Sequence, residues 1–322
     1  MPRAYQGSFI TKTPITPSGP YQCSTASGVW TIDQMVGWQK AGLWPTAGQF
    51  PVGTFVIFAQ GANATYRCKY TYSCNTNSTA AAASVNSSQG SAAGNSTVGI
   101  FALGIAPSSA STTRNKFSYG YCTSTSATAS SAASNSGSAA GNSTVGIFAI
   151  GNSTTTRDKY TYSNCVSASA TCSSYASYSG SAVGNSTVGI FSFGCRSQRN
   201  KYTYSGDTNA TATSASASTG AQGGAAGNST IGIFALGGNT TTRNKYTYSG
   251  DTNVVATSSS GNSYYGAAAG NACVGIFALG SFAGTTRNKY IYSGDVNTSA
   301  AASARSMCGG SAASNGTTGV NV

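Results

Sequence analysis

The stretch IGIFALGGNTTTRNKYTYSGD, from Ile231 to Asp251, contains the pattern that decides the fold. Its first half is an apolar run that ends in a double glycine. In its second half Tyr246 and Tyr248 fall on one side of an extended chain and Lys245 on the other, which is the period-two pattern of a β-strand. The SGD triplet that follows is typical of a turn. The stretch therefore predicts two strands joined by a loop and followed by a turn.

This pattern recurs six times along the chain. The motif VGIFALG or a close variant marks each copy, and a motif similar to RNKYTYS follows it. Successive copies are separated by 43, 47, 43, 43 and 43 residues, so the extra residues of one copy are confined to a loop. The aligned aromatic residues are Phe58, Phe101, Phe148, Phe191, Phe234 and Phe277.

Two further short segments complete each unit. A Thr/Ala/Ser run such as ATATSAS follows Asn209, and a small-residue segment such as GGAAGNST begins at Gly223. Each predicts one more strand, which gives four strands per unit. Periods of about 40 to 50 residues are typical of β-propellers and solenoids. We predict an all-β, six-bladed propeller, with a β-solenoid as the alternative.

The order of these elements resembles the kelch repeat. Gly237-Gly238 matches the double glycine of that family, and the sequence YTYSGD from Tyr246 to Asp251 matches its Tyr-rich strand and turn. The resemblance covers roughly residues 52 to 322 and implies a kelch-like β-propeller. The chain lacks the tryptophan that the family has in the outer strand, so we expect slimmer blades.

The two ends of the repeat region predict how the ring closes. The first unit begins directly at its apolar strand, whereas the carboxyl end, GGSAASNGTTGVNV from Gly309, repeats the small-residue strand. Residues Gly309 to Ser314 are therefore expected to pair with Phe55 to Gly61, which would remove exposed sheet edges. We divide the chain into an amino-terminal attachment or plug module, residues 1–50, and a propeller, residues 51–322.

The first fifty residues lie outside the repeat and hold all three tryptophans, at positions 30, 38 and 44. Thr31 to Ala41 predicts a short helix that Thr31 caps and Gly42 ends. The string SGVWTIDQMVGWQKAGLWP resembles a short module of bacteriophage tail and fibre proteins. The resemblance implies virion attachment, and packing beneath the propeller is the alternative.

The ionisable side chains argue against catalysis. The chain has five Asp, no Glu and no His, against seventeen Lys plus Arg. A Ser-His-Asp or Cys-His arrangement is impossible, and the usual zinc and iron sites need His or clustered Cys. We predict that the protein is not an enzyme and has no cofactor or metal.

The basic residues follow the repeat. The net charge of +12 favours an anionic partner. In a propeller, equivalent positions form a ring, and we predict that this ring binds phosphate or carboxylate groups beside aromatic side chains. The alternative is that the Lys stems lie along neighbouring blades with their charged ends in water. The predicted binding residues are Arg67, Lys69, Arg114, Lys116, Arg157, Lys159, Arg199, Lys201, Arg243, Lys245, Arg287 and Lys289.

Three other patterns admit two interpretations each. The SGD triplets are expected to be turns rather than calcium loops, because each offers a single carboxylate. The NST triplets at Asn95, Asn142, Asn185 and Asn228 match the N-glycosylation pattern but are expected to be turns. The nine Cys leave at least one unpaired, with Cys68–Cys74 and Cys165–Cys172 bridges or free thiols as the alternatives.

No stretch approaches the roughly 18 apolar residues of a membrane helix, and the amino terminus lacks the apolar core of a signal peptide. We therefore expect neither membrane insertion nor export by the general secretory route.

These observations favour a non-enzymatic virion structural or adhesion protein, a phage tail or fibre component. It would bind a host-surface glycan or neighbouring virion proteins, and it could form a homo-oligomer. It would be made in the host cytoplasm and reside in the virion. The alternative is an intracellular kelch-like scaffold for protein interactions. A glycan-cleaving enzyme resembling galactose oxidase is disfavoured, because its copper ligands would include His.

Overall fold

The computed structural model describes residues 31–40, 54–106, 108–216, 223–280 and 284–315. The chain divides into two compact units, Met1–Val52 and Gly53–Val322. In the first unit the described element is helix α1 (Ile32–Lys40). The second unit contains every described strand.

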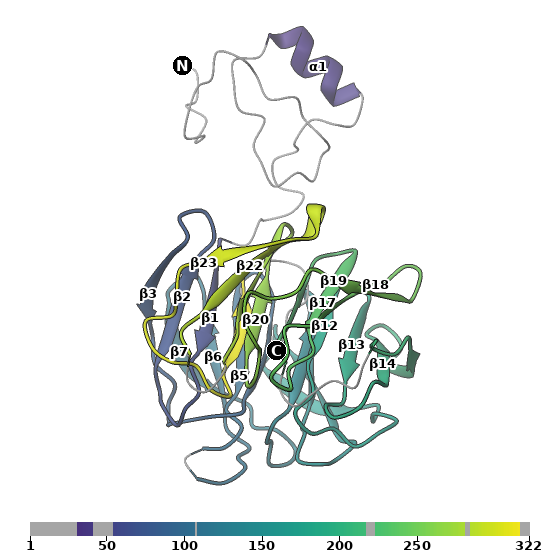
Figure 1. Cartoon of the computed structure of the whole chain (residues 1–322). Helices are drawn as coiled ribbons and strands as arrows, with labels where there is room; N and C mark the ends of the chain where they lie inside the picture. Colours follow the sequence, from purple (N-terminus) through teal and green to yellow (C-terminus); the bar gives the residue numbers. More distant parts are fainter. Residues whose placement is uncertain (1–30, 41–53, 107, 217–222, 281–283, 316–322) are drawn as a thin grey trace. The chain divides into compact units, whose positions relative to one another are not determined.

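The second unit folds into six four-stranded antiparallel sheets, which we call blades 1 to 6 (Figure 1). In each blade the small-residue strand is innermost, followed by the apolar strand, the Tyr-rich strand and the Thr/Ala strand. Blade 1 contains β24 (Ser311–Ser314), β1 (Phe55–Ala59), β2 (Arg67–Thr71) and β3 (Thr76–Ala80). Blade 2 contains β4 (Ser91–Gly94), β5 (Val98–Ala102), β6 (Arg114–Ser118) and β7 (Thr123–Ala127). Blade 3 contains β8 (Ser138–Gly141), β9 (Val145–Ala149), β10 (Arg157–Thr161) and β11 (Val166–Ala170).

The other three blades repeat this arrangement. Blade 4 contains β12 (Ala182–Gly184), β13 (Val188–Ser192), β14 (Arg199–Thr203) and β15 (Thr208–Ala212). Blade 5 contains β16 (Ala225–Gly227), β17 (Ile231–Ala235), β18 (Arg243–Thr247) and β19 (Thr252–Ala256). Blade 6 contains β20 (Ala267–Gly270), β21 (Val274–Ala278), β22 (Arg287–Ile291), the 3₁₀ turn η2 (Tyr292–Gly294) and β23 (Val296–Ala300).

The inner strands contact one another in the cyclic order β24, β4, β8, β12, β16, β20 and back to β24. A closed cycle of six blades defines a six-bladed β-propeller and excludes the solenoid, which would leave two capped ends. The 47-residue spacing arises in the loop between β5 and β6, where Ile105 and Ala110 form an additional bridge.

Strand β24 closes the ring. It pairs antiparallel with β1, from Val56 opposite Ser314 to Ala59 opposite Ser311. The predicted pairing of the two ends is therefore present, although the strand starts at Ser311. Gly309 has a φ of 62°, a left-handed conformation that does not continue a β-strand.

The meander gives the propeller two distinct ends. Connections between the first and second strands and between the third and fourth strands lie at one end, which we call the turn end. Connections between the second and third strands, together with the segments that lead into the next blade, lie at the other, which we call the loop end.

The NST triplets form turns at the turn end. The side-chain oxygen of Asn95 accepts hydrogen bonds from the backbone N–H groups of Thr97 and Val98, at 2.9 and 3.0 Å. Its side-chain nitrogen donates to the carbonyl oxygen of Ser143 in the next blade, at 2.9 Å. The equivalent Asn residues repeat both contacts, so the turn interpretation holds and each turn also joins two blades.

Small residues allow the inner strands to pack closely. Gly94 lies opposite Gly99, and a Cβ atom on Gly99 would stand only 2.6 Å from the Tyr119 hydroxyl oxygen. Blade 1 has Ser314 at the position of Gly94, and the Tyr72 hydroxyl donates to the Ser314 hydroxyl at 3.0 Å. Glycine therefore makes room for the tyrosine hydroxyl in blade 2, whereas blade 1 accommodates a serine through this hydrogen bond.

The apolar core is divided among six interfaces between blades. Phe234 of blade 5, for example, packs against Val183 and Ile190 of blade 4. The five phenylalanines of the VGIFALG motifs are at most 1% exposed, as predicted. Cys68, Cys74, Cys165 and Cys172 are free thiols, so the local bridges considered for them are absent.

Helix α1 begins with a capping box. The Gln34 N–H donates to the Thr31 hydroxyl at 3.2 Å, and the Thr31 N–H donates to the Gln34 side-chain oxygen at 2.9 Å. Thr31 therefore caps the helix as predicted, whereas Ala41 and Gly42 lie outside the described residues. Among the helices that the structure describes, none is long and apolar enough to cross a membrane.

Candidate binding surface

The six arginines of the predicted binding set are buried between blades, at most 1% exposed. Each opens the third strand of its blade and stacks its guanidinium on a phenylalanine ring of the next blade. The distance from the guanidinium carbon to the ring centroid is 4.2 Å for Arg199 on Phe234 and 4.5 Å for Arg243 on Phe277. The other four arginines repeat this contact across their own interfaces.

Hydrogen bonds add to these contacts. Arg243 donates to the side-chain oxygens of Asn297 at 2.8 Å and Asn288 at 3.2 Å, both in blade 6. Arg114 differs in having a carboxylate partner, Asp158, at 2.8 Å. Burial lowers the pKa of the Arg67, Arg157, Arg199 and Arg243 guanidinium groups to about 10, so they are positively charged at neutral pH.

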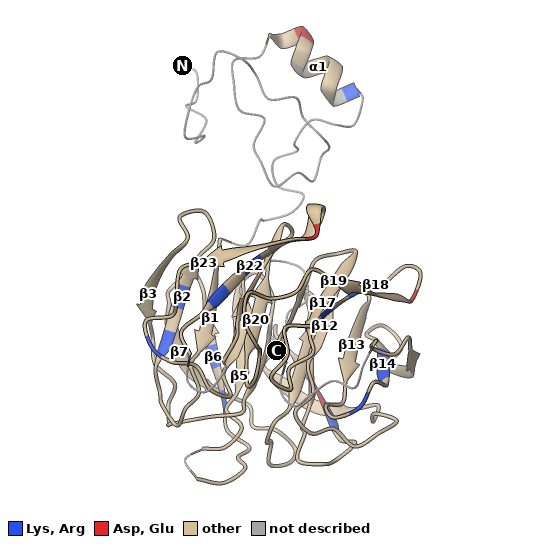
Figure 2. Cartoon of the chain, viewed as in Figure 1, with Lys and Arg blue, Asp and Glu red and all other residues tan. Residues whose placement is uncertain are grey.

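This arrangement corrects the predicted binding set. A guanidinium that is enclosed between two blades and stacked on a ring does not reach a partner outside the propeller. The arginines hold neighbouring blades together, and the surface positions of the motif are the lysines alone. Figure 2 shows basic positions along strands such as β2 and β22, each of which has one Arg and one Lys two residues apart.

Three lysines pair with an aspartate of the next blade. The ammonium nitrogens of Lys159, Lys201 and Lys245 lie 3.5, 3.5 and 3.2 Å from carboxylate oxygens of the SGD turns. These side chains are 28–31% exposed and lie at the turn end, where the third and fourth strands connect. The partners, in the same order, are Asp207, Asp251 and Asp295.

The aspartates of the SGD triplets lie in turns, as predicted. Asp295 has a φ of 52°, and its carboxylate accepts hydrogen bonds from the Tyr290 hydroxyl and the Thr257 N–H. Partial burial raises the pKa of this carboxyl, but the hydrogen bonds and Lys245 outweigh that effect and lower the pKa to about 2. Among the described residues there is no cluster of three His, Cys, Asp or Glu that could hold a metal ion.

By the repeat, the other three lysines correspond to turns without a carboxylate. The residues equivalent to the aspartates are Asn75, Cys122 and Cys165 in blades 1, 2 and 3. The Lys116 ammonium lies 3.5 Å from the Cys165 sulfur, and the Lys69 ammonium lies 4.3 Å from the Phe55 ring centroid.

These three lysines are neighbours, because ring closure places blade 1 between blades 6 and 2. The four Asp residues of the second unit already have basic partners. At the lysine positions of the motif, the described residues therefore supply no carboxylate partner over half of the ring. The three half-buried lysines there are Lys289, Lys69 and Lys116, which we call the lysine arc.

The basic motif alone does not predict that three of its lysines have a carboxylate partner and three do not. The signal was present in the residue eight positions after each Arg, which is Asp in three copies and Asn or Cys in the other three. Its meaning depends on a structural fact, that a Lys of this motif can reach the turn of the following blade, as Lys159, Lys201 and Lys245 do.

These features define a six-bladed β-propeller with arginines buried between its blades and an uneven distribution of paired lysines on its surface. No profile of a known protein family matches the chain. No curated protein matches its sequence significantly.

Solved structures do resemble the fold. The structure is similar to that of TolB from Acinetobacter baumannii, with a TM-score of 0.57, 11% sequence identity, and coverage of 87% of this chain and 71% of TolB. It is also similar to the structure of YjhT, with a TM-score of 0.57, 11% identity, and coverage of 71% of this chain and 88% of YjhT. At this level of identity the likeness establishes the propeller fold alone.

Proposed function

We propose that this chain is a non-enzymatic adhesion or structural protein of a virus particle, a kelch-like propeller of the phage tail or fibre. It binds an anionic partner, either a host-surface glycan or a neighbouring virion protein, through the lysine arc. The observation that carries this proposal is that three adjacent lysines have no carboxylate partner among the described residues, whereas the equivalent lysines of the other blades do.

The geometry of the lysine arc suits a multivalent anion. The three side chains leave equivalent positions of adjacent blades and are half-buried, so their stems are restrained before a partner arrives. An extended chain of phosphate or carboxylate groups can contact several of them at once, and each contact makes the next one intramolecular. Such contacts add to the attraction produced by the net charge of +12.

Two features of the sequence support the remaining parts of the proposal. The lack of His and Glu removes the commonest proton-transfer groups, which favours binding over catalysis. The capped helix α1 lies within the string that resembles a phage tail and fibre module, which favours a place in a virion.

The test is mass spectrometry of virus particles purified from cells that make the chain. The intact chain should be present at a fixed ratio to the other particle proteins. Washing with about 1 M salt, where the Debye length falls to about 3 Å, should release more of it if it is held by the lysine arc. Recovery of the chain exclusively from the soluble cytoplasm would overturn the proposal in favour of an intracellular scaffold.

A further inference from the structure

The turn between the third and fourth strands binds a side-chain oxygen of its own residue in a repeated way. In blade 4 one carboxylate oxygen of Asp207 accepts hydrogen bonds from the Tyr202 hydroxyl and from the Thr171 N–H, the latter at 2.9 Å. The other carboxylate oxygen lies 3.5 Å from the Lys159 ammonium nitrogen. We call this set of three donors, a tyrosine hydroxyl, a backbone N–H and a lysine, the turn site.

Three other blades also place an oxygen at this point. In blades 5 and 6, Asp251 and Asp295 repeat all three contacts of Asp207. In blade 1 the residue is neutral, and the Asn75 side-chain oxygen accepts from the Tyr70 hydroxyl at 2.6 Å and from the Ala301 N–H at 2.7 Å. The position of the donors therefore suits an acceptor oxygen.

Blade 3 has a sulfur atom where these blades have oxygen. Cys165 takes the place of Asp207 in the repeat. The Cys165 carbonyl oxygen accepts a hydrogen bond from the Thr128 hydroxyl, and the Asp207 carbonyl is bound in the same way from blade 3. The Lys116 ammonium nitrogen lies 3.5 Å from the Cys165 sulfur. The turn and its lysine are therefore placed as in blade 4.

The Tyr160 hydroxyl shows what this turn site lacks. It corresponds to the Tyr202 hydroxyl, is fully buried, and has no partner at normal hydrogen-bond geometry among the described residues. Burial, followed by the interaction with the adjacent Cys165 side chain, raises the pKa of Tyr160, so the hydroxyl keeps its proton at neutral pH. A buried donor without an acceptor is unfavourable, and a thiol is only a weak acceptor.

Oxidation of the sulfur would supply two acceptor oxygens. The sulfur attacks one oxygen of hydrogen peroxide, the O–O bond breaks, and a sulfenic acid and water are formed. A second peroxide oxidises the sulfenic acid to a sulfinic acid and is itself reduced to water. Each step removes two electrons from the sulfur, and the sulfinic acid then releases its proton to water. The product resembles a carboxylate in having two oxygens and one negative charge.

We propose that Cys165 is a peroxide-sensitive modification site whose sulfinate occupies the turn site of blade 3. One sulfinate oxygen accepts from the Tyr160 hydroxyl and the Thr128 N–H, and the other pairs with Lys116. Donors already directed at the developing oxygens stabilise the transition state in which those oxygens are added. The modification does not rest on the proposed function, although it gives Lys116, a member of the lysine arc, an anionic partner.

Cys122 provides the matched comparison within the chain. It occupies the same turn position in blade 2 and is exposed, whereas Cys165 is half-buried. Its blade has Phe117 at the position of Tyr160, so the hydroxyl is missing, and the corresponding lysine, Lys69, lies over a phenylalanine ring. Exposure alone predicts faster oxidation of Cys122. The turn site predicts faster conversion of Cys165 to the sulfinate.

The experiment treats the reduced full chain with hydrogen peroxide and follows each cysteine by peptide mass spectrometry. Cys165 should gain two oxygen atoms about tenfold faster than Cys122. Tyr160→Phe, which installs the residue that blade 2 already has, should remove most of this difference while the circular dichroism stays unchanged. The proposal is overturned if Cys122 forms a sulfinate as fast as Cys165, or if the folded Tyr160→Phe variant keeps the tenfold preference.

A second measurement needs no oxidant. Cys165→Asp places a carboxylate permanently in the turn site, and it should raise the melting temperature by about 2 °C through the new contacts with Tyr160 and Lys116. Cys122→Asp is the control, because its turn lacks the hydroxyl, and it should leave the melting temperature unchanged. A Cys165→Asp variant no more stable than the Cys122→Asp variant would show that the turn site of blade 3 does not accept an anion, and would overturn the proposal.

Discussion

The arginine and the lysine of the Arg-x-Lys motif are two residues apart on the same strand, yet the arginine is buried between blades and the lysine is partly exposed. Each arginine stacks on a phenylalanine of the next blade, and all six do so. Three lysines pair with a carboxylate, and the other three occupy repeats in which the equivalent turn residue is neutral. Repetition is therefore strict at the blade interfaces and relaxed at the surface, and the surface is where the halves of the ring can acquire different partners.

The largest effect should come from removing residues 306–322. The deletion takes away β24, exposes the edge of β1 and opens the ring at the interface between blades 6 and 1. We expect aggregation, or a loss of stability that exceeds that of any single core substitution. Size-exclusion chromatography and thermal unfolding measure it, with deletion of 316–322 as the control that keeps β24. A soluble, equally stable 306–322 deletion would refute closure by this strand.

The second-largest effect is expected from alkaline pH, which should unfold the protein. Burial raises the pKa of six interface tyrosines above the usual value of 10: Tyr72, Tyr119, Tyr162, Tyr204, Tyr248 and Tyr292. The folded state keeps protons that the unfolded state loses, so stability is full below pH 10 and falls as the pH rises above it. The buried arginines act in the opposite sense, because burial lowers their pKa to about 10.

The tyrosines should dominate this balance. Tyr160, Tyr202, Tyr246 and Tyr290 also have a raised pKa, mainly through burial, so raised tyrosines outnumber lowered arginines. Tyrosine ionisation, followed by ultraviolet absorbance, should therefore occur together with unfolding in one cooperative step above pH 10. Gradual ionisation of these tyrosines with the circular dichroism unchanged would show that they are accessible.

Phe234→Ala tests one blade interface. It removes a ring that is fully buried against blade 4 and leaves the Arg199 guanidinium without its stacking partner. Large-to-small changes of this kind cost about 3–5 kcal/mol, which urea denaturation resolves. Val255→Ala is a suitable control, because Val255 is 64% exposed. Equal stability of the Phe234→Ala variant and the parent protein would mean that this interface contributes little.

Substitutions within one motif compare the buried and the surface positions directly. Arg243→Ala removes the arginine donor from the side-chain oxygens of Asn297 and Asn288, and the second of these keeps only the Ser260 N–H. This substitution should cost about 2–4 kcal/mol. Lys245→Ala removes a partly exposed pair with Asp295 and should cost at most about 1 kcal/mol. The same urea experiment measures both. A larger loss from the Lys substitution would reverse the roles assigned here.

The sequence predicted the fold well, because constant spacing and alternation are properties of the chain itself. Six copies of one unit fixed the number of blades, and the surplus small-residue strand at Gly309 predicted closure. Alternation also grouped Arg243 with Lys245 on one strand face. The alternation pattern contains no information on the neighbouring blade, which covers Arg243. The arginines were therefore expected at the surface, where unpaired arginines usually lie.

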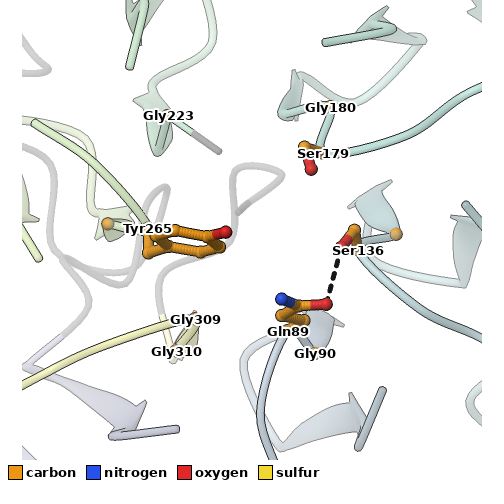
Figure 3. Close-up of a pocket in the computed structure, with 11 residues that line it drawn as sticks. Gln89, Gly90, Ser136, Ser179, Gly180, Gly223, Tyr265, Gly309 and Gly310 are labelled. Atoms are coloured by element: carbon orange, nitrogen blue, oxygen red, sulfur yellow. Dashed lines mark hydrogen bonds between the residues drawn. The ribbon is translucent and has the colours of Figure 1, made fainter. Parts of the chain in front are cut away.

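The candidate sites were harder to predict for the same reason. The lysine arc depends on which turn each lysine meets, a contact between residues about 50 positions apart, such as Lys245 and Asp295. A small pocket on the propeller axis is lined by loop segments of different blades that share no distinctive motif (Figure 3). Their glycines were visible in the sequence, but the convergence of Gln89 and Tyr265 on the axis follows only from ring closure.

The central claim is that the lysine arc binds anions, and it is tested by substitutions that should have the smallest effect on stability. Lys69, Lys116 and Lys289 are changed together to Ser, and the matched control changes Lys159, Lys201 and Lys245 to Ser. Both triple variants lower the formal charge equally. The measurement is the salt concentration that elutes each folded variant from immobilised dextran sulfate, a polyanionic glycan. We predict that the lysine-arc variant elutes at clearly lower salt than the control, which should stay close to the parent protein. Equal elution of the two variants would contradict a lysine arc that binds anions.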